Sequence, residues 1–154
     1  MFKRSSVQIK NVDLGKSVTI IEPSNLYDCK LGDNVFIGPF VEIQRGVVIG
    51  KRSKIQSHSF VCELVSIGED CTIAHGVMFV NDRFATGQPA GGNRSLWEKT
   101  VLGNHVHVGS NATILPVMIC DDVVIGAGSV VTKNIERPGI YAGNPACFIR
   151  ELSV

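Results

Sequence analysis

Two histidines, His58 and His75, are the residues of this 154-residue chain best suited to proton transfer. An imidazole with an unperturbed pKa of about 6.5 can accept or donate a proton near neutral pH. General acid–base catalysis of this kind typically contributes about 10²–10⁴-fold to a rate. His75 is the better candidate to accept or orient a proton. The alternative is that both histidines are only solvated surface residues, so the fold must decide whether they come together.

The element that positions both histidines is a six-residue repeat. From position 31 an aliphatic residue recurs at every sixth position without a slip: Leu31, Ile37, Ile43, Ile49, Ile55, Val61, Ile67 and Ile73. The fifth residue of each unit is small or β-branched, and the second is often glycine. Such a short fixed period predicts a β-helix, because one unit cannot bury its apolar face alone and stacked units can. A helical period of 3.6 residues does not fit a spacing of six.

The repeat is interrupted once and then resumes. It begins irregularly over residues 14–26, disappears between about 80 and 101, and returns at Leu102 to continue through Val131. We therefore expect a single domain over residues 1–154, with an irregular lead-in at 1–13, an inserted loop at about 80–101 and a tail at about 133–154. A loop of this length inside a compact domain is more often functional than not, although a tolerated insertion on the outside of a solenoid is the alternative.

Composition and charge argue against several classes of protein. The formal net charge is +1, without a long run of Lys and Arg, which argues against nucleic-acid binding. We find no stretch of about 18 apolar residues that would span a membrane, and the N-terminal residues lack the apolar segment of a signal peptide. The five cysteines show no CxxC spacing, so we expect buried structural thiols in a reducing cytoplasm.

The aliphatic–Gly–x–x–small–x unit, with the tail motif Ala-Gly-Asn-Pro-Ala at 142–146, resembles the hexapeptide-repeat acyltransferases. The resemblance implies an all-β fold, a left-handed parallel β-helix with three hexapeptides per coil. It also implies a homotrimer with acceptor sites between subunits. In that family the pantetheine arm of coenzyme A runs along an edge of the prism.

With three units per coil, residues eighteen apart stack at a strand spacing of about 4.8 Å. This stacking predicts that His58 and His75 lie within a few ångströms of each other at one edge of the prism. If the inserted loop replaces the end of one coil, four more residues join the same edge. They are small or polar and leave room for a thin ligand, so the candidate coenzyme A contacts are Ser110, Asn111, Ala127 and Gly128.

Segments 73–84, 95–97 and 112–116 are similar to bacterial N-acetyltransferases of nucleotide-linked amino sugars, including dTDP-linked 3-amino-3,6-dideoxyhexoses. Those enzymes make sugars for lipopolysaccharide or surface-layer glycans. The resemblance implies acetyl-CoA as co-substrate, with Asn81 and Asp82 holding the sugar near its amine and Phe84 or Trp97 packing on the base. An activated thioester then needs only an oriented amine and a stabilised oxyanion.

No metal is expected. His105 and His107, two apart on one expected strand, would share a side and could bind a metal, but a solvent-facing pair is the reading we favour. The trimeric carbonic anhydrases of this fold place a second histidine five residues after a His-Gly block, where this chain has Val80. Two other functions stay open: O-acetylation of a sugar or small alcohol or acetylation of an antibiotic, and a non-catalytic β-helix scaffold subunit.

Overall fold

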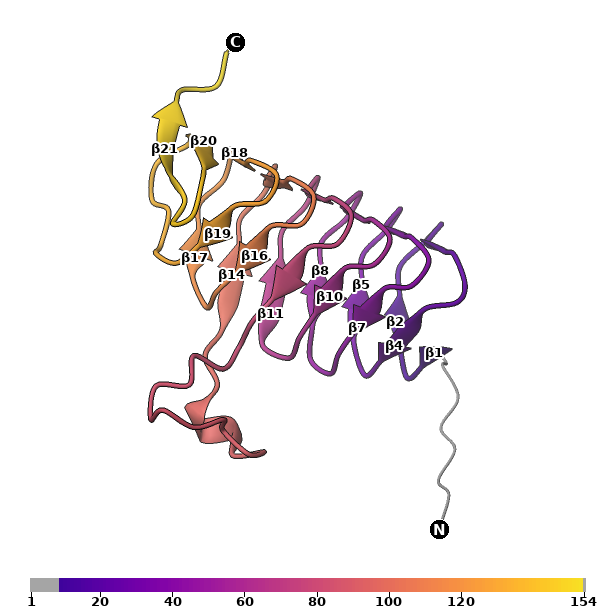
Figure 1. Cartoon of the computed structure of the whole chain (residues 1–154). Helices are drawn as coiled ribbons and strands as arrows, with labels where there is room; N and C mark the ends of the chain where they lie inside the picture. Colours follow the sequence, from indigo (N-terminus) through magenta and orange to yellow (C-terminus); the bar gives the residue numbers. More distant parts are fainter. Residues whose placement is uncertain (1–8, 154) are drawn as a thin grey trace.

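The computed structural model describes residues 9–153, and nearly all its regular structure is a stack of short strands that forms a three-faced prism (Figure 1). Each coil of the chain contributes one strand to each of three sheets. Sheet A contains, in order, β1 (Ile9–Lys10), β4 (Asn25–Tyr27), β7 (Glu42–Ile43), β10 (Phe60–Val61), β13 (Met78–Phe79), β16 (Thr113–Ile114) and β19 (Val130–Val131). Sheet B contains β2 (Asp13–Leu14), β5 (Lys30–Leu31), β8 (Val48–Ile49), β11 (Val65–Ile67), β14 (Thr100–Leu102) and β17 (Met118–Ile119).

Sheet C completes the prism and carries the C-terminal end. It contains β3 (Thr19–Ile20), β6 (Phe36–Ile37), β9 (Lys54–Ile55), β12 (Thr72–Ile73), β15 (His107–Val108), β18 (Val123–Ile125), β20 (Gly139–Ala142) and β21 (Cys147–Arg150). All described strand pairs are parallel except the terminal hairpin of β20 and β21. Phe36 pairs with Lys54, eighteen positions on, as three hexapeptides per coil predict. The predicted all-β hexapeptide β-helix, the left-handed parallel type, is confirmed.

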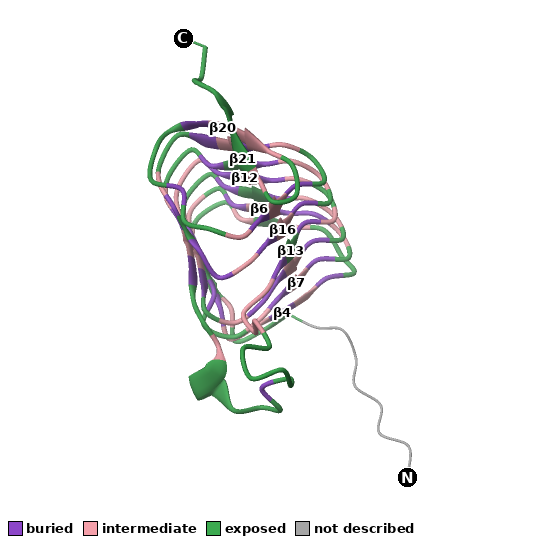
Figure 2. Ribbon diagram, turned by 60° about the vertical axis from the view of Figure 1, so that its left-hand side comes forward, coloured by how far each residue is buried: buried purple, intermediate pink, exposed green. Residues whose placement is uncertain are grey.

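The core is the interior of the prism. Buried stretches, purple in Figure 2, recur along each coil of the prism. The first residue of each unit points inward, and Ile37, Ile43 and Ile55 are completely buried. Burying one such side chain contributes about 1.5–3 kcal/mol. Ser53 and Ser59 occupy inward fifth positions, and their hydroxyls donate to carbonyl oxygens over 2.8 Å, so they cost no unpaired polar group. The period therefore accounts for the whole interior of the stack.

Close stacking explains the glycine at the second position of the unit. A Cβ added to Gly50 would lie 2.5 Å from the carbonyl carbon and oxygen of Gly68 in the next coil. No side chain fits in that space, so the coils approach each other there only because glycine lacks a Cβ. The residues that follow in the corners adopt positive φ angles, for example Arg52 at +61° and Leu64 at +71°. Corners rather than strands thus carry the conformational demands of this fold.

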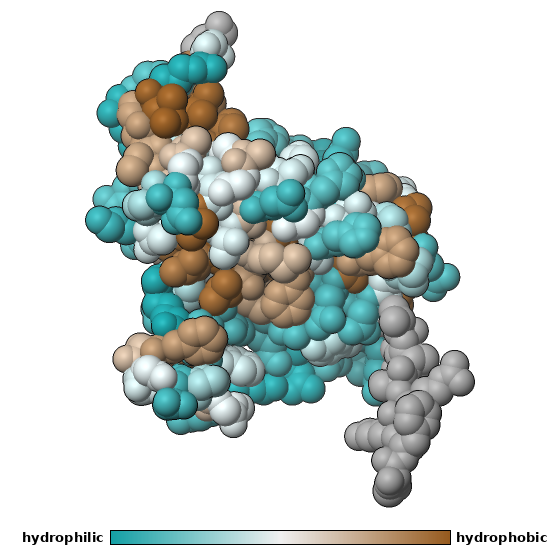
Figure 3. Space-filling model, in the orientation of Figure 1, coloured by the Kyte–Doolittle hydropathy of each residue, from teal (hydrophilic) through white to brown (hydrophobic). Residues whose placement is uncertain are grey.

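The ends of the chain differ in part from expectation. Most of the expected irregular lead-in falls on residues 1–8, which lie outside the described residues. Residues 9–10 and 13–14 form β1 and β2 and already pair with the next coil, so that part of the expectation is wrong. The expected tail folds back as β21 against β20. Apolar surface gathers at this end (Figure 3), where Phe148 and Ile149 are 39% and 59% exposed.

The cysteines follow the expectation only for three of the five. Cys29, Cys62 and Cys71 are buried, and burial raises the pKa of the Cys62 thiol to about 12 and that of Cys29 to about 11. Cys120 is half-buried and Cys147 is exposed, because the last lies in the terminal hairpin outside the prism. Residues 9–153 contain no helix long and apolar enough to cross a bilayer.

Candidate functional site

The two histidines lie where the chain passes from sheet C to sheet A, in a column of turns that we call the histidine corner. It comprises residues 39–40, 57–58, 75–76, 110–111 and 127–128. Backbone hydrogen bonds connect successive turns: His58 N–H donates to Pro39 (3.2 Å), Gly76 to Ser57 (3.0 Å), Asn111 to His75 (2.9 Å) and Gly128 to Ser110 (2.8 Å). The structure therefore assembles the predicted column, including the four residues expected beside coenzyme A.

Within the histidine corner the two imidazoles belong to adjacent coils but not to the same position of the turn. His58 has a φ of +63° and lies beside Gly76, whereas His75 lies beside Ser57. This one-residue offset makes the pair diagonal. Both side chains are exposed, so a ligand can reach them from solvent. Two exposed imidazoles on adjacent turns are thus available to a ligand at this corner, and imidazole is suited to proton transfer.

Small residues above the histidines shape the C-terminal half of the corner. Gly128 has a φ of +67°, and nothing lies within 4 Å of a Cβ placed on it. The side chain of Asn111 reaches back over Gly76, so a Cβ on Gly76 would collide with its amide oxygen. The surface at Gly128 is consequently free of side-chain bulk, whereas the surface at Gly76 is covered by the Asn111 amide.

A residue that we did not single out from the sequence completes the N-terminal half of the corner. Phe40 stacks on His58, with ring centroids 4.9 Å apart and planes inclined by 29°. Its side chain is 57% exposed. The signal was present in the sequence, because Phe40 precedes His58 by one coil of eighteen residues at the same position of the unit.

The inserted loop leaves the prism at the next corner, between β13 and β14, and contains a short 3₁₀ helix, η1 (Arg94–Leu96) (Figure 1). Met78 and Phe79 of β13 separate the loop from the histidine corner within one chain. The backbone N–H of Glu98 donates to the carbonyl of Asn81 over 2.9 Å and closes the base of the loop. The loop and the histidines therefore occupy different corners of the same protomer.

Two of the residues expected to hold a sugar make contacts inside the protein. One carboxylate oxygen of Asp82 accepts from Phe84 N–H (2.9 Å) and the other from Ala90 N–H (2.7 Å). The amide of Asn81 donates to the carbonyl of Glu63 over 3.2 Å. Asp82 thus organises the loop. Each of its carboxylate oxygens, and the side-chain oxygen of Asn81, can still accept a further hydrogen bond.

The two aromatic residues expected at the nucleotide base differ in exposure. Phe84 is 58% exposed at a positive φ of +52°. Trp97 is half-buried, with the guanidinium of Arg94 at 5.9 Å from its ring centroid. Arg94 also pairs with Glu63 over 3.1 Å. Phe84 therefore offers the freer ring surface of the two.

The expectation that His105 and His107 share one strand is wrong. His107 lies in β15, whereas His105 precedes it at a corner with a φ of +53°. The imidazole of His105 lies between two carboxylates, at 3.2 Å from Asp122 and 3.8 Å from Asp70. Among residues 9–153 no group of three or more His, Cys, Asp or Glu side chains is arranged to hold a metal ion.

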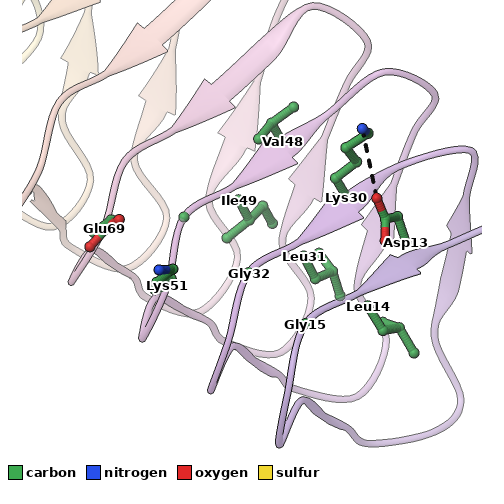
Figure 4. A pocket seen from close by; sticks show the side chains of 11 residues that line it. Asp13, Leu14, Gly15, Lys30, Leu31, Gly32, Val48, Ile49, Lys51 and Glu69 are labelled. Atoms are coloured by element: carbon green, nitrogen blue, oxygen red, sulfur yellow. Dashed lines mark ion pairs between the residues drawn. The ribbon is translucent and has the colours of Figure 1, made fainter.

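A hollow of about 340 Å³ lies away from the histidine corner, over sheet B and its turn into sheet C (Figure 4). An ion pair of Lys30 and Asp13, 3.7 Å apart, crosses part of it. Its floor contains Gly15, Gly32 and Gly50, whose lack of side chains follows from close coil stacking. The hollow is thus a by-product of coil packing and adds no chemistry to the site.

Two segments of the chain match models of known repeats. Residues 28–63 match the bacterial transferase hexapeptide of six repeats, and residues 99–133 match the hexapeptide repeat of succinyl-transferase. These are hexapeptide repeats of bacterial transferases. The resemblance of the repeat to that of the hexapeptide-repeat transferases is thereby confirmed, and the two matches flank the inserted loop, which interrupts the repeat.

Individual proteins similar to this hexapeptide-repeat chain include the bifunctional protein GlmU of Streptococcus uberis, which is 34% identical over 93% of this chain and 32% of its own length. A probable macrolide acetyltransferase of Lysinibacillus sphaericus is 38% identical over 61% of this chain and 63% of its own. The chain thus spans less than two thirds of these relatives. A mutant of AntD, an N-acyltransferase from Bacillus cereus in complex with dTDP and coenzyme A, matches with a TM-score of 0.62 and 24% identity, covering 92% of this chain and 84% of its own.

Proposed function

We propose that the chain is an acetyl-CoA-dependent N-acetyltransferase that acetylates the amino group of a dTDP-linked amino deoxy sugar. The observation that carries the proposal is the histidine corner, where two exposed imidazoles on adjacent coils lie below the small residues 127–128. The fold shared with AntD, whose complex contains dTDP and coenzyme A, supports both the donor and the nucleotide. The reaction would belong to bacterial surface-glycan biosynthesis in the cytoplasm.

The corner offers a simple path for the reaction. The amine attacks the thioester carbonyl carbon, so that a C–N bond forms and the C–S bond then breaks. His75 accepts the proton that the nitrogen loses and returns it to the departing thiolate, which leaves as free coenzyme A. His58 orients the amine. Because the donor is already activated, positioning and one proton transfer supply the required catalysis.

We further propose that the working form is a homotrimer. In one chain the loop carrying Asn81, Asp82, Phe84 and Trp97 and the histidine corner lie at different corners of the prism. A second copy can bring its loop to the histidines of the first, and closed cyclic symmetry is usual for homo-oligomers. Sedimentation should give about three chain masses, and a fully active monomer would contradict a shared site.

The second candidate is O-acetylation of a sugar or small alcohol, or acetylation of an antibiotic, and the 38% identity to a probable macrolide acetyltransferase favours the antibiotic. A hydroxyl is a poorer nucleophile than an amine and depends more strongly on a general base. The deciding experiment incubates the protein with acetyl-CoA and a panel of dTDP-linked amino sugars, free sugars and a macrolide, and identifies products by mass spectrometry. An acetylated amino sugar supports the first proposal, and an acetyl ester supports the second.

A scaffold subunit is distinguished by a separate measurement. A ligand that binds only the folded state raises stability by about 2.7 kcal/mol at one hundred times its Kd. Acetyl-CoA should therefore raise the Tm of the protein in a concentration-dependent manner. An unchanged Tm up to millimolar acetyl-CoA, with no product from the panel, would contradict enzymatic function and leave the scaffold reading.

A further inference from the structure

The N-terminal half of the histidine corner is not used by the roles proposed above. Phe40 occupies it, and its backbone N–H donates to the Pro23 carbonyl over 2.6 Å, so the column of turns continues one coil beyond Phe40. One face of the Phe40 ring packs on His58. The side chain is nevertheless more than half exposed. A large apolar ring thus lies in solvent directly against a candidate catalytic imidazole.

A hollow of about 410 Å³ adjoins this ring. Its lining is made of two neighbouring coils and consists of Pro23, Ser24, Asn25, Phe40, Val41 and Glu42. The hydroxyl of Ser24 is already engaged with the carbonyl oxygens of Ile21 and Gly38, each at 2.9 Å. The polar groups left to a ligand are therefore the amide of Asn25 and the carboxylate of Glu42. The volume falls in the range typical of small-molecule sites.

The charge of the hollow limits what it can hold. Glu42 brings a negative charge, and the only hydrogen bond to its carboxylate among the described residues comes from the amide of Gln44 (3.0 Å). A phosphate would be repelled by this carboxylate. Apolar walls and an exposed aromatic face instead suit a ring that is flat or has an apolar face. The hollow fits an uncharged or cationic ring with hydroxyl or amino substituents, which a sugar or an aglycone provides.

We propose that this hollow is the acceptor subsite and that Phe40 determines which acceptors fit. The inference rests on the proposed acyl transfer. It places the acceptor at the N-terminal end of the histidine corner and the acetyl donor at the C-terminal end. The acceptor ring lies against the face of Phe40 that His58 leaves free, and its reacting nitrogen or oxygen extends past the edge of the phenyl ring to His58 and His75. The thioester arrives from the opposite side, past residues 127–128. The diphosphate of a nucleotide-linked acceptor is directed out of the hollow, away from Glu42.

Steady-state kinetics of Phe40 variants test this assignment. Phe40→Ala removes the ring and Phe40→Tyr keeps a flat ring, while Val48→Ala truncates a 43% exposed apolar residue on sheet B as the matched control. The acceptors are dTDP-4-amino-4,6-dideoxyglucose and the same amino sugar without its nucleotide. Phe40→Ala should raise the KM for both acceptors about tenfold and leave the KM for acetyl-CoA within about twofold. Phe40→Tyr should raise the KM for the acceptors less than Phe40→Ala does, and only the Val48→Ala control should behave as wild type.

Binding measured without turnover separates this inference from the proposed function. Saturation-transfer NMR reports contact of each acceptor with the protein even if no acetyl group is transferred. Acceptor binding that Phe40→Ala abolishes, without any acetyl transfer, supports the subsite and contradicts the enzymatic proposal. Acetyl transfer with unchanged acceptor constants in Phe40→Ala overturns the subsite and leaves the enzyme intact. Failure of both acceptors to bind the wild-type protein overturns the subsite as well.

Discussion

Asn111 lies directly on the coil above His75, and its backbone N–H donates to the His75 carbonyl over 2.9 Å. The two residues are separated in the chain by the entire inserted loop. Their contact shows that the coil after the loop resumes in register with the coil before it. The position of His75 at the corner is consequently fixed from above by Asn111 and from below by Ser57, whose carbonyl accepts from Gly76 over 3.0 Å.

Replacement of His75 tests its proposed role. If His75 is the general base, His75→Ala should lower kcat by about 10²-fold or more. A loss near about tenfold would mean that the amine arrives deprotonated and that the imidazole only positions it. His58→Asn keeps a hydrogen bond and should lose less activity than His58→Ala. Wild-type rates in both alanine variants from about pH 6 to about pH 9 would exclude this corner as the active site.

Asp82 is expected to act through the loop. Asp82→Ala removes the acceptor of the Phe84 and Ala90 N–H groups, and hydrogen bonds to a charged group contribute about 1.5–3 kcal/mol each. The loop should open more often, which amide hydrogen exchange over residues 82–97 measures. The KM for the acceptor should rise while the Tm of the prism stays close to wild type. Unchanged exchange in this segment would contradict an organising role for Asp82.

Two glycines separate steric and conformational demands at the corners. At Gly50 an added Cβ meets the backbone of Gly68, so Gly50→Ala should lower the free energy of unfolding by about 1–3 kcal/mol or more, as overpacking does. At Gly46 the φ is +76° and nothing lies within 4 Å of the added Cβ. Gly46→Ala should cost only about 1–2 kcal/mol, and Gly46→Asn less. Urea denaturation measures both, and a larger loss at Gly46 than at Gly50 would contradict this reading.

The interior should be sensitive to single truncations. Ile73 is completely buried below the histidine corner, and Ile73→Ala should lower the free energy of unfolding by about 2–5 kcal/mol. The adjacent Thr72 faces outward, so Thr72→Ala is the matched control and should stay within about 1 kcal/mol. Thermal or urea denaturation compares the pair. Equal losses would show that the outer face of β12 is also packed, for example against another subunit.

Alkaline pH should destabilise the fold through its buried thiols. Burial raises the pKa of the Cys62 thiol from 9.0 to about 12. Below about pH 9 the thiol is neutral in the folded and in the unfolded protein, so burial of the neutral thiol stabilises the fold fully there. Between about pH 9 and about pH 12 the unfolded chain ionises first, and the free energy of unfolding should fall. Cys62→Ala should flatten this decline. Cys147→Ala, which removes an exposed thiol, should not.

The period explains which features the sequence could predict. Inward Ile55 and Ile73 and the stacking of their units follow from counting sixes and eighteens. The column reaches Gly128 only because the loop lengthens the next coil, in which Ile73 pairs with Val108, and because the coil from Val108 to Ile125 is one residue short. The same count places His105 fourth in the unit of Leu102, as His58 is in the unit of Ile55, and hence at a corner. The expectation that His105 shares a strand with His107 was wrong, because it assumed the two-residue alternation of a strand at positions that the six-residue repeat assigns to a corner.

The loop is less predictable because it has no period. The use of both Asp82 oxygens by the loop backbone depends on where Ala90 returns, and no spacing in the sequence indicates that return. The exposure of Phe84 and the half-burial of Trp97 likewise depend on local packing. Residue types alone indicate a ligand-binding loop. They do not distinguish the residues that maintain its shape from the residues that present a free surface, because that depends on the folded loop.

The closed base of the loop has a consequence for diversification. The Glu98 N–H to Asn81 carbonyl hydrogen bond closes the base of the loop, and the coil that follows resumes in register above His75. The length and composition of the loop can therefore change while the prism keeps its geometry. Chemistry at the histidine corner and binding of the nucleotide by the loop can then change by separate mutational steps. Exchanging residues 82–97 for the corresponding segment of another such chain offers a route to changing the nucleotide preference on an unaltered scaffold.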